Sequence, residues 1–324
     1  MTWSWGVNQT SFFRPSWESS KAAFWSSVFL PTFNDTVCVL GSRVQYTNAQ
    51  GAFGFYLNGT LLVCSSDVLA NIDRPHQWKL QWMTVPNSGN SSDKKDDLEW
   101  NNAAYANGTE PNDFVYFFGS HRKYQDSLGT RQLLSRISWQ DLHAGAWDSK
   151  QQFWLGENYG WHTGWSNSSN FVDRMETLWD TFIPEFTVQW SPELAAFFVL
   201  YIEFAATSVK MMTAPSLEGP WTNGEDVMPI PAPLNDTSNA FCYAVKVHDE
   251  LLSLSTLHQR MASRDSVSSK QAQEKKLAAK RGREEEEHHI FSYVCNSYDV
   301  GFLFQPDNRI FYTPIFNKLT LTSA

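Results

Sequence analysis

The sequence has no apolar run long enough to cross a membrane, because a transmembrane helix needs about 18 or more consecutive apolar residues. We therefore expect no membrane span. Positive charge is also scarce, since 25 Lys and Arg stand against 34 Asp and Glu and leave a net charge of −9. Binding to a phosphate backbone requires clustered Lys and Arg, so we do not expect nucleic acid as a partner.

Motifs for metals, cofactors and export are missing as well. No Cys/His spacing resembles a zinc site, and neither a glycine-rich phosphate loop nor a Gly-X-Ser-X-Gly elbow is present. We therefore expect no metal and no cofactor. The start of the chain, Met1-Thr-Trp-Ser-Trp5, lacks the basic and apolar regions of a signal peptide.

Cysteine is rare, but its positions and the glycosylation motifs indicate export. Free buried thiols and disulfides both fit the four cysteines, and sequence does not choose among their three possible pairings. These residues, all on predicted strands, are Cys38, Cys64, Cys242 and Cys295. Asn-X-Ser/Thr acceptors, more frequent than chance, begin at Asn8, Asn34, Asn58, Asn90, Asn107, Asn167 and Asn235. We expect an extracellular glycoprotein whose N-terminus, with its signal peptide, is missing from this chain.

What is abundant is aromatic residues, at 15% with 15 Trp, a content that suits sheets and sugar-binding clefts. The clearest local pattern is a β-hairpin, in which Glu185-Phe-Thr-Val-Gln-Trp190 and Phe197-Phe-Val-Leu-Tyr201 flank a turn with Ser191 and Pro192. A further strand is predicted around Met211. A carboxylate, Glu185, stands at the head of this hairpin.

The strand–turn–strand pattern recurs along the chain. One unit joins 24–30 to 37–40 and has a second hairpin turn at Asn58-Gly59, and another joins 100–105 to 114–118 with outer strands at 132–137 and near Phe153. The last joins 241–248 to 290–295, followed by 309–312 and 316–321. Four such units favour a β-propeller over a β-sandwich, which has no reason to repeat this order. We expect one domain over 1–324, with a charged low-complexity insertion at 259–289.

These residues carry a family resemblance. Glu185-Phe-Thr-Val188, Thr213-Ala-Pro-Ser-Leu-Glu-Gly-Pro-Trp221, Tyr243-Ala-Val-Lys-Val-His248, Phe291 to Ser297 and Arg309 to Pro314 resemble uncharacterised five-bladed propellers, domains of unknown function related to glycoside hydrolase families 43 and 32. The resemblance implies an all-β, five-bladed-type propeller, of which about four blades are identifiable here. It also implies acids at the starts of inner strands, with Glu185 at the position of the general acid. The essential Asp of the first blade has no counterpart in this chain.

Glycoside hydrolysis normally needs two carboxyl groups that flank the scissile bond. Glu185, beside Phe186 and before Trp190, suits the general acid, and a structural carboxylate is the alternative. Lys246 and His248 alternate on one predicted strand, so both can face one side and reach a ligand. The residues expected to bind the substrate are Trp25, Trp100, Trp161, Trp165, Tyr243, Lys246 and His248. Trp161 and Trp165 lie in a stretch that reads as a loop, whereas packing between blades is the competing explanation for each ring.

The predicted fold and the candidate residues are compatible with two functions. The first is a secreted carbohydrate-binding propeller that cleaves glycosidic bonds with Glu185 as general acid. The second is a non-catalytic sugar- or protein-binding propeller, since a fold does not imply an activity.

Overall fold

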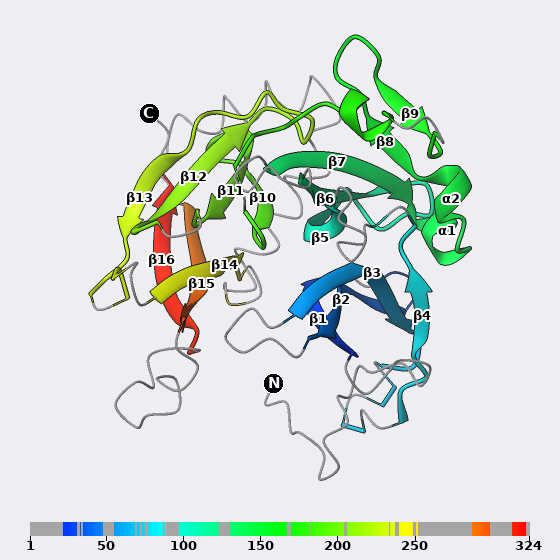
Figure 1. Cartoon of the computed structure of the whole chain (residues 1–324), viewed down its shortest axis with the longest axis horizontal. Coiled ribbons are helices and arrows are strands. Elements are labelled where there is room, and N and C mark those ends of the chain that lie inside the picture. Colours follow the sequence, from blue (N-terminus) through cyan, green and yellow to red (C-terminus); the bar gives the residue numbers. More distant parts are fainter. Residues whose placement is uncertain are drawn as a thin grey trace, which may run out of the picture. The chain divides into compact units, whose positions relative to one another are not determined.

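Strands make up nearly all of the regular structure in the computed structural model of the chain (Figure 1). The chain divides into two units, residues 1–185 and 186–324, and each is described by itself. The expected single domain over 1–324 stays a prediction. The structure describes residues 22–30, 33, 35–47, 55–68, 70–71, 73–74, 77–86, 88, 97–122, 130–166, 170–181, 183–203, 206–232, 234–236, 240–248, 251, 287–298 and 313–321.

The first sheet of unit 1 is an antiparallel meander. Its strands, in spatial order, are β1 (Ala22–Phe29), β2 (Val37–Tyr46), β3 (Phe55–Ser65) and β4 (Gln81–Thr84). The predicted hairpin between β1 and β2 is confirmed. The predicted turn at Asn58-Gly59 is wrong, because both residues lie within β3 and oppose Arg43 alone in a β-bulge. Gly59 has a φ of 94°, and this left-handed conformation suits a bulge as well as a turn.

The second sheet of unit 1 has five strands in sequence order. They are β5 (Asp97–Ala106), β6 (Phe114–Arg122), β7 (Thr130–Ser138), β8 (Gln152–Trp154) and β9 (Trp161–Thr163). The strands expected from β5 to β8 are confirmed. The stretch around Trp161 that was read as a loop is instead the edge strand β9. Short helices α1 (Trp139–His143) and α2 (Trp147–Lys150) connect β7 to β8, and the 3-10 helix η3 (Val172–Arg174) follows β9.

One hydrophobic core joins the two sheets of unit 1. Leu40 and Leu62 from the first sheet pack in the same cluster as Trp100, Phe117 and Leu133 from the second. All five are fully buried. Because strand side chains alternate between two faces, the apolar runs of β2, β3, β6 and β7 supply this core.

Unit 2 also contains two antiparallel sheets. The first is β10 (Thr187–Ser191), β11 (Ala196–Tyr201), β12 (Ser208–Ala214) and β13 (Glu225–Pro229), and the second is β14 (Ala240–Val247), β15 (Glu287–Ser297) and β16 (Ile315–Leu321). The predicted hairpin after Glu185 is confirmed as β10–β11. Its turn is held by Ser191, whose Oγ accepts a hydrogen bond from the backbone N–H of Leu194 at 3.1 Å.

Two predicted segments of unit 2 fall wholly or partly outside the described residues. The strand expected at 309–312 is one, and most of the insertion expected at 259–289 is the other. The insertion boundary needs a correction, because 287–289 begin β15 and His289 is fully buried there. His289 packs edge-on against the ring of Phe198. The buried part of β15 therefore begins at a residue that the sequence had assigned to the charged insertion.

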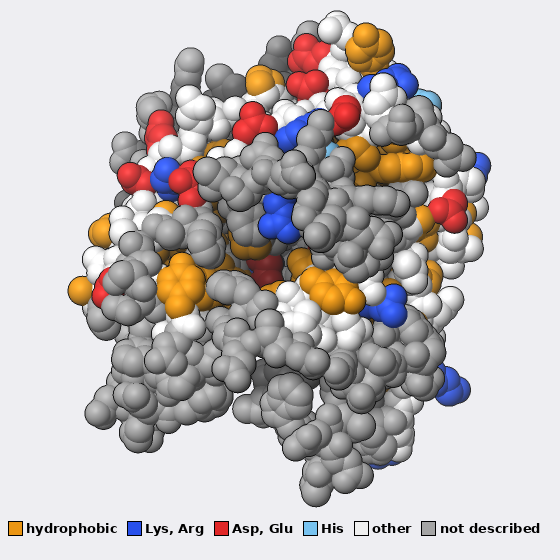
Figure 2. Space-filling view, viewed as in Figure 1, with side chains coloured by type: hydrophobic (Ala, Val, Ile, Leu, Met, Phe, Trp, Pro, Cys, Tyr) orange, Lys and Arg blue, Asp and Glu red, His pale blue; other side chains and the backbone are white. Residues whose placement is uncertain are grey.

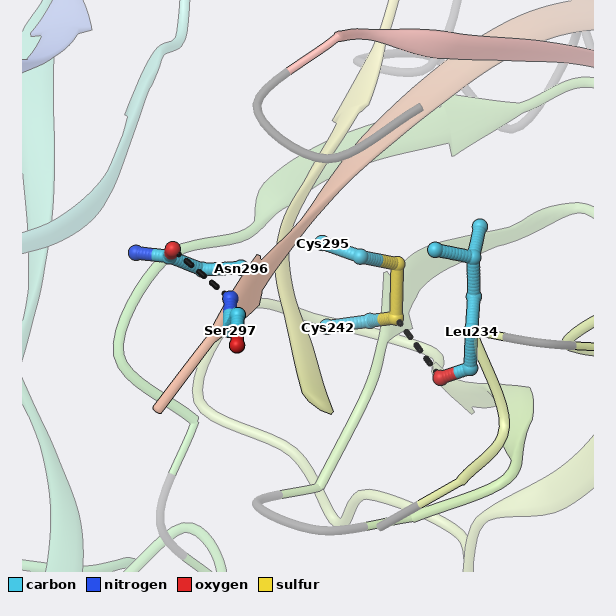
Figure 3. The surroundings of a disulfide bond; sticks show 5 residues. All are labelled: Leu234, Cys242, Cys295, Asn296 and Ser297. Carbon is cyan, nitrogen blue, oxygen red and sulfur yellow. Dashed lines mark hydrogen bonds between the residues drawn. A yellow bond between two sulfur atoms is a disulfide. The ribbon is translucent and has the colours of Figure 1, made fainter. Parts of the chain in front are cut away.

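All four cysteines form disulfides within their own units. Cys38 pairs with Cys64 across β2 and β3, and Cys242 pairs with Cys295 across β14 and β15 (Figure 3). In each case the partners stand directly opposite each other on adjacent strands, with Cα atoms 4.1 and 4.0 Å apart. Such separations belong to close cross-strand pairs, which explains why strand register alone brings these sulfurs together.

The predicted fold class is confirmed: the chain is all-β, with antiparallel meander sheets of the β-propeller type. The structure describes four of these sheets. Among the described residues, no helix is long and apolar enough to cross a membrane.

Candidate functional site

Glu185 lies in a bend two residues before β10 begins and is half-buried. The next residue, Phe186, is buried, so the chain is anchored on the C-terminal side of the carboxylate by an apolar ring. The sequence predicted Glu185 as the first residue of the strand, whereas the strand begins two residues later at Thr187. The function assigned to its carboxyl group remains a prediction.

A second carboxylate, absent from the sequence predictions, is buried inside unit 1. Glu99 on β5 is only 7% exposed, and its Oε2 accepts a hydrogen bond from Ser42 Oγ on β2 at 3.3 Å. The side-chain amide of Asn101 in turn donates to Ser42 Oγ. Buried polar groups are costly without partners, so this cluster of Ser42, Glu99 and Asn101 is an ordered network between two strands.

A bulge of three residues in β5 creates this cluster. Glu99 pairs with Ser120 and Ala103 pairs with Phe118, so three residues of β5 oppose the single residue Gly119 on β6. A Cβ atom on Gly119 would lie 2.3 Å from the carbonyl oxygen of Glu99 and 2.5 Å from the ring of Trp100. Glycine at 119 therefore permits the close approach that turns the side chains of the bulge out of strand alternation.

The same bulge holds the segment that leads to Glu185. Asn102 donates a hydrogen bond from Nδ2 to the carbonyl oxygen of Ile183 at 2.7 Å, and Gln132 on β7 lies against both groups. Asn102 and Ile183 are both buried, so water does not compete for this contact. The chain two residues before Glu185 is thus fixed to the strand that carries Glu99.

The aromatic residues proposed from the sequence divide into core and surface. Trp100 is wrong as a ligand platform, because it is 0% exposed and packs against Phe153 in the core of unit 1. Trp165 is half-buried against Phe153 and Phe171, so most of its ring area is used in packing. The contacts of both rings agree with core packing, which was the alternative to sugar binding in the sequence predictions.

Trp25 is 42% exposed on β1, and its ring contacts Phe55 edge-on with centroids 4.5 Å apart. Its indole N–H donates a weak hydrogen bond to the hydroxyl of Tyr46 at 3.4 Å. Together Trp25, Tyr46 and Phe55 form an exposed aromatic group on the first sheet. Trp161 is half-buried on β9 beside Tyr116 and Trp154.

The remaining predicted residues lie in unit 2. Lys246 pairs across the sheet with Ser292, and the ring Nε2 of His248 lies 2.7 Å from Ser292 Oγ. Lys246 on β14 and His248, the first residue after that strand, therefore both lie beside Ser292. Lys246 Nζ donates to the carbonyl oxygen of Phe186 at 3.4 Å. Tyr243 is half-buried and stacks on Phe241 with ring centroids 5.6 Å apart.

Charge is mixed on the one face of the molecule that Figure 2 draws. Figure 2 shows Lys and Arg side chains interspersed with Asp and Glu on that face, without a continuous basic patch among the described residues. No group of three or more His, Cys, Asp and Glu suited to a metal ion occurs within the described ranges.

With this geometry in view, comparison with known proteins places the chain in a family. A family model described as a domain of unknown function, DUF5005, matches residues 6–320. The chain belongs to the DUF5005 family. The sequence matches none of the curated proteins with which it was compared.

Solved structures give the DUF5005 chain a fold likeness only. A putative hydrolase from Bacteroides ovatus ATCC 8483 superposes with a TM-score of 0.54 at 14% identity, over 92% of this chain. The DUF5005 chain spans 61% of the length of that protein. A second structure, RS223-Beta-xylosidase, has a TM-score of 0.31 at 8% identity, over 84% of this chain and 86% of its own.

The DUF5005 sequence did contain a signal for the residues that the predictions missed. Glu99, Asn101 and Asn102 lie in a strand whose other residues, apart from Asp97, are apolar or aromatic, and Asn102 breaks the alternation of period two that Glu99 and Asn101 keep. A Glu and two Asn so close together inside a strand indicate a bulge with buried polar partners. The distant partners Ser42 and Ile183 had no such signal.

Proposed function

We propose that this DUF5005 chain is a secreted carbohydrate-binding protein that hydrolyses glycosidic bonds, with Glu185 as general acid and Glu99 as the second carboxyl group. The observation that carries the proposal is the hydrogen bond from Asn102 to Ile183, which ties the segment of Glu185 to the bulge of Glu99. Two carboxyl groups on one rigid support are what hydrolysis of a glycosidic bond needs. The fold likeness to the Bacteroides protein agrees with this proposal but does not identify a substrate.

In this proposal each carboxyl group has a distinct environment. Glu99 is buried and accepts a hydrogen bond from Ser42, so its orientation is fixed before a ligand arrives. Glu185 is half-buried in the bend before β10, where a proton can be exchanged with solvent. Glu185 would protonate the leaving oxygen, whereas Glu99 would act on the opposite side of the sugar ring.

The experiment compares Glu185→Gln, Glu99→Gln and the control Glu110→Gln, which changes an exposed Glu between β5 and β6. Turnover is measured on a panel of aryl glycosides with good and poor leaving groups. Loss of a general acid should lower kcat by about 100-fold or more on poor leaving groups and far less on good ones, because good leaving groups need no proton. The control should behave as the wild type.

Absence of turnover by the wild-type chain on every glycoside would refute hydrolysis. An equal loss on good and poor leaving groups would refute Glu185 as the acid. The exposed group of Trp25, Tyr46 and Phe55 favours the second candidate, a non-catalytic sugar-binding protein. In that case glycan binding persists in Glu185→Gln and falls in Trp25→Ala.

The secreted location is part of the proposal. The two disulfides support it, because structural disulfides persist in oxidising compartments and are rare in the cytosol. Asn107 and Asn235, two of the glycosylation acceptors, are exposed. Mass spectrometry of the protein from its native source, before and after removal of N-glycans, tests the location.

A further inference from the structure

The outer strands of the second sheet of unit 1 carry an ordered polar row that the proposed function does not use. Tyr116 on β6 pairs with Arg136 on β7, Arg136 pairs with Gln152 on β8, and Gln152 pairs with Thr163 on β9. Residues directly opposite each other on adjacent strands share one face of the sheet. These four residues therefore form one line across the neighbouring strands β6 to β9 (Figure 1).

Hydrogen bonds connect this row from end to end. Arg136 donates from Nε to Gln152 Oε1 at 2.8 Å and from Nη1 to the hydroxyl of Tyr116 at 3.3 Å. Gln152 donates from Nε2 to Thr163 Oγ1 at 3.4 Å. The planar side chains of the row are thereby oriented without a ligand, which lowers the entropy cost of binding one.

Aromatic rings flank the guanidinium of Arg136. Its Cζ lies 4.0 Å from the ring centroid of Trp161 and 4.2 Å from that of Phe114. Trp161 is supported by Trp154, with ring centroids 5.4 Å apart. We call Phe114, Tyr116, Arg136, Gln152, Trp154, Trp161 and Thr163 the Arg136 face.

No carboxylate pairs with Arg136 within the part of the chain that the structure describes. Both of its hydrogen bonds go to neutral oxygens, and among the described residues its other contacts are with aromatic rings. Arg131, on the same strand, differs because it pairs with Asp173 at 3.7 Å. A half-buried guanidinium with fixed orientation, and without a counter-ion among the residues described, is complementary to a carboxylate, which it can bind through paired N–H groups.

We propose that the Arg136 face binds a saccharide that carries a carboxylate, such as a uronate residue. The carboxylate pairs with Arg136, the hydroxyl groups bond to Gln152 and Thr163, and the apolar face of a sugar ring packs on Trp161. Charge complementarity selects this ligand over a neutral saccharide, and the rings select it over a free inorganic anion. The inference rests on the carbohydrate-binding part of the proposed function and not on hydrolysis at Glu185.

The test measures binding of two ligands to the full chain by isothermal titration calorimetry. One ligand is tetragalacturonate and the other is its methyl ester, which keeps the sugar rings but has no charge. The wild type should bind the acid form about tenfold more tightly, the effect of one charge-assisted contact. The preference should shrink as salt is raised, because salt screens the half-exposed guanidinium. Equal affinity for the two forms, or binding of neither, would overturn the proposal.

Matched variants locate the site. Arg136→Gln keeps a planar amide but removes the charge, and it should abolish the preference for the acid form. The control Arg174→Gln makes the same charge change at an exposed residue of η3 and should leave the preference intact. Trp161→Ala should weaken both forms about tenfold, within the range for loss of a stacking aromatic side chain. Equal preferences in Arg136→Gln and Arg174→Gln would overturn the assignment of the site.

Two further measurements keep the result interpretable. If Arg136→Gln loses its near-ultraviolet circular dichroism signal, Arg136→Lys replaces it, and this variant should retain only part of the preference because lysine lacks the planar fork. Glu185→Gln should bind the acid form as the wild type does. Loss of turnover in Glu185→Gln with binding of the acid form kept is therefore the expected result. Loss of acid binding in this variant would place the ligand elsewhere and overturn the assignment to the Arg136 face.

Discussion

Breaking the disulfide between Cys242 and Cys295 should destabilise the chain by about 4 kcal/mol. The bond closes a loop of sequence separation 53 between β14 and β15. In the chain-entropy model, a bond across a loop of this length removes about 14 cal/mol/K of entropy from the unfolded chain, or about 4 kcal/mol at 25 °C. The perturbation is the double variant Cys242→Ala/Cys295→Ala, which leaves no free thiol to react.

The other disulfide provides a matched comparison. Cys38 and Cys64 have a sequence separation of 26, for which the same relation gives about 3.5 kcal/mol. Both bonds are buried cross-strand pairs with nearly equal Cα separations, so the loss of packed sulfur is similar in the two variants. The difference of about 0.6 kcal/mol between the two variants therefore isolates loop length.

The assay is urea denaturation of both double variants and the wild type, followed by circular dichroism and by tryptophan fluorescence. Non-reduced peptide mapping of the wild type first establishes that each bond is present. A loss below about 1 kcal/mol for the longer loop would refute the entropic account, because the unfolded chain would then retain structure that already closes the loop. A clearly larger loss for the shorter loop would refute it as well.

Two other predictions concern single residues. Gly119→Ala should destabilise unit 1 by about 1–3 kcal/mol, because its Cβ would overlap the backbone of Glu99, and denaturation together with turnover should show that stability and activity fall together. Burial, aided by the carboxylates of Glu203 and Asp226, raises the pKa of Tyr201 from 10.0 to about 12. Its contribution to stability should be complete below pH 10 and lost as pH rises from 10 toward 12, since only the unfolded state ionises readily there. Urea denaturation across this range should show a weaker pH dependence in Tyr201→Phe.

The central hairpins were predictable because their sequence signals are local. β10 and β11 combine β-branched and aromatic residues on both sides of a Ser-Pro turn, and the structure places both strands there. The edge strands β4, β9 and β13 were missed for a physical reason. β13 has two charged residues and no fully buried one, since an edge strand packs on one side only and carries weak apolar alternation. The short β9 was misread as a loop for the same reason.

The candidate site was less predictable than the fold. Glu185 could be singled out because it stands alone at the head of a clear hairpin, whereas Glu99 lies inside a strand and becomes buried only through β2 and β6. Trp100 and Trp25 look alike in sequence, because core packing and sugar binding both use a flat indole ring. Only the structure separates them, with one fully buried and the other 42% exposed.

Register shifts explain why alternation alone could not find the polar groups. Ser42 stands directly at the bulge between β2 and β3, Glu99 begins the bulge between β5 and β6, and Lys246 ends the one between β14 and β15. Each bulge inserts residues that have no partner in the strand ladder. The bulges at Ser42 and Lys246 have one extra residue and so change the face that the following side chains occupy, whereas β5 has two extra residues and changes the alternation only within its bulge. A pattern of period two read from the sequence continues unchanged through such a point, so it is wrong beyond a bulge with one extra residue and within the longer bulge of β5. The burial of residues within or beside a bulge therefore cannot be predicted from alternation alone. A bulged strand can present a polar group where regular pairing would place an apolar one.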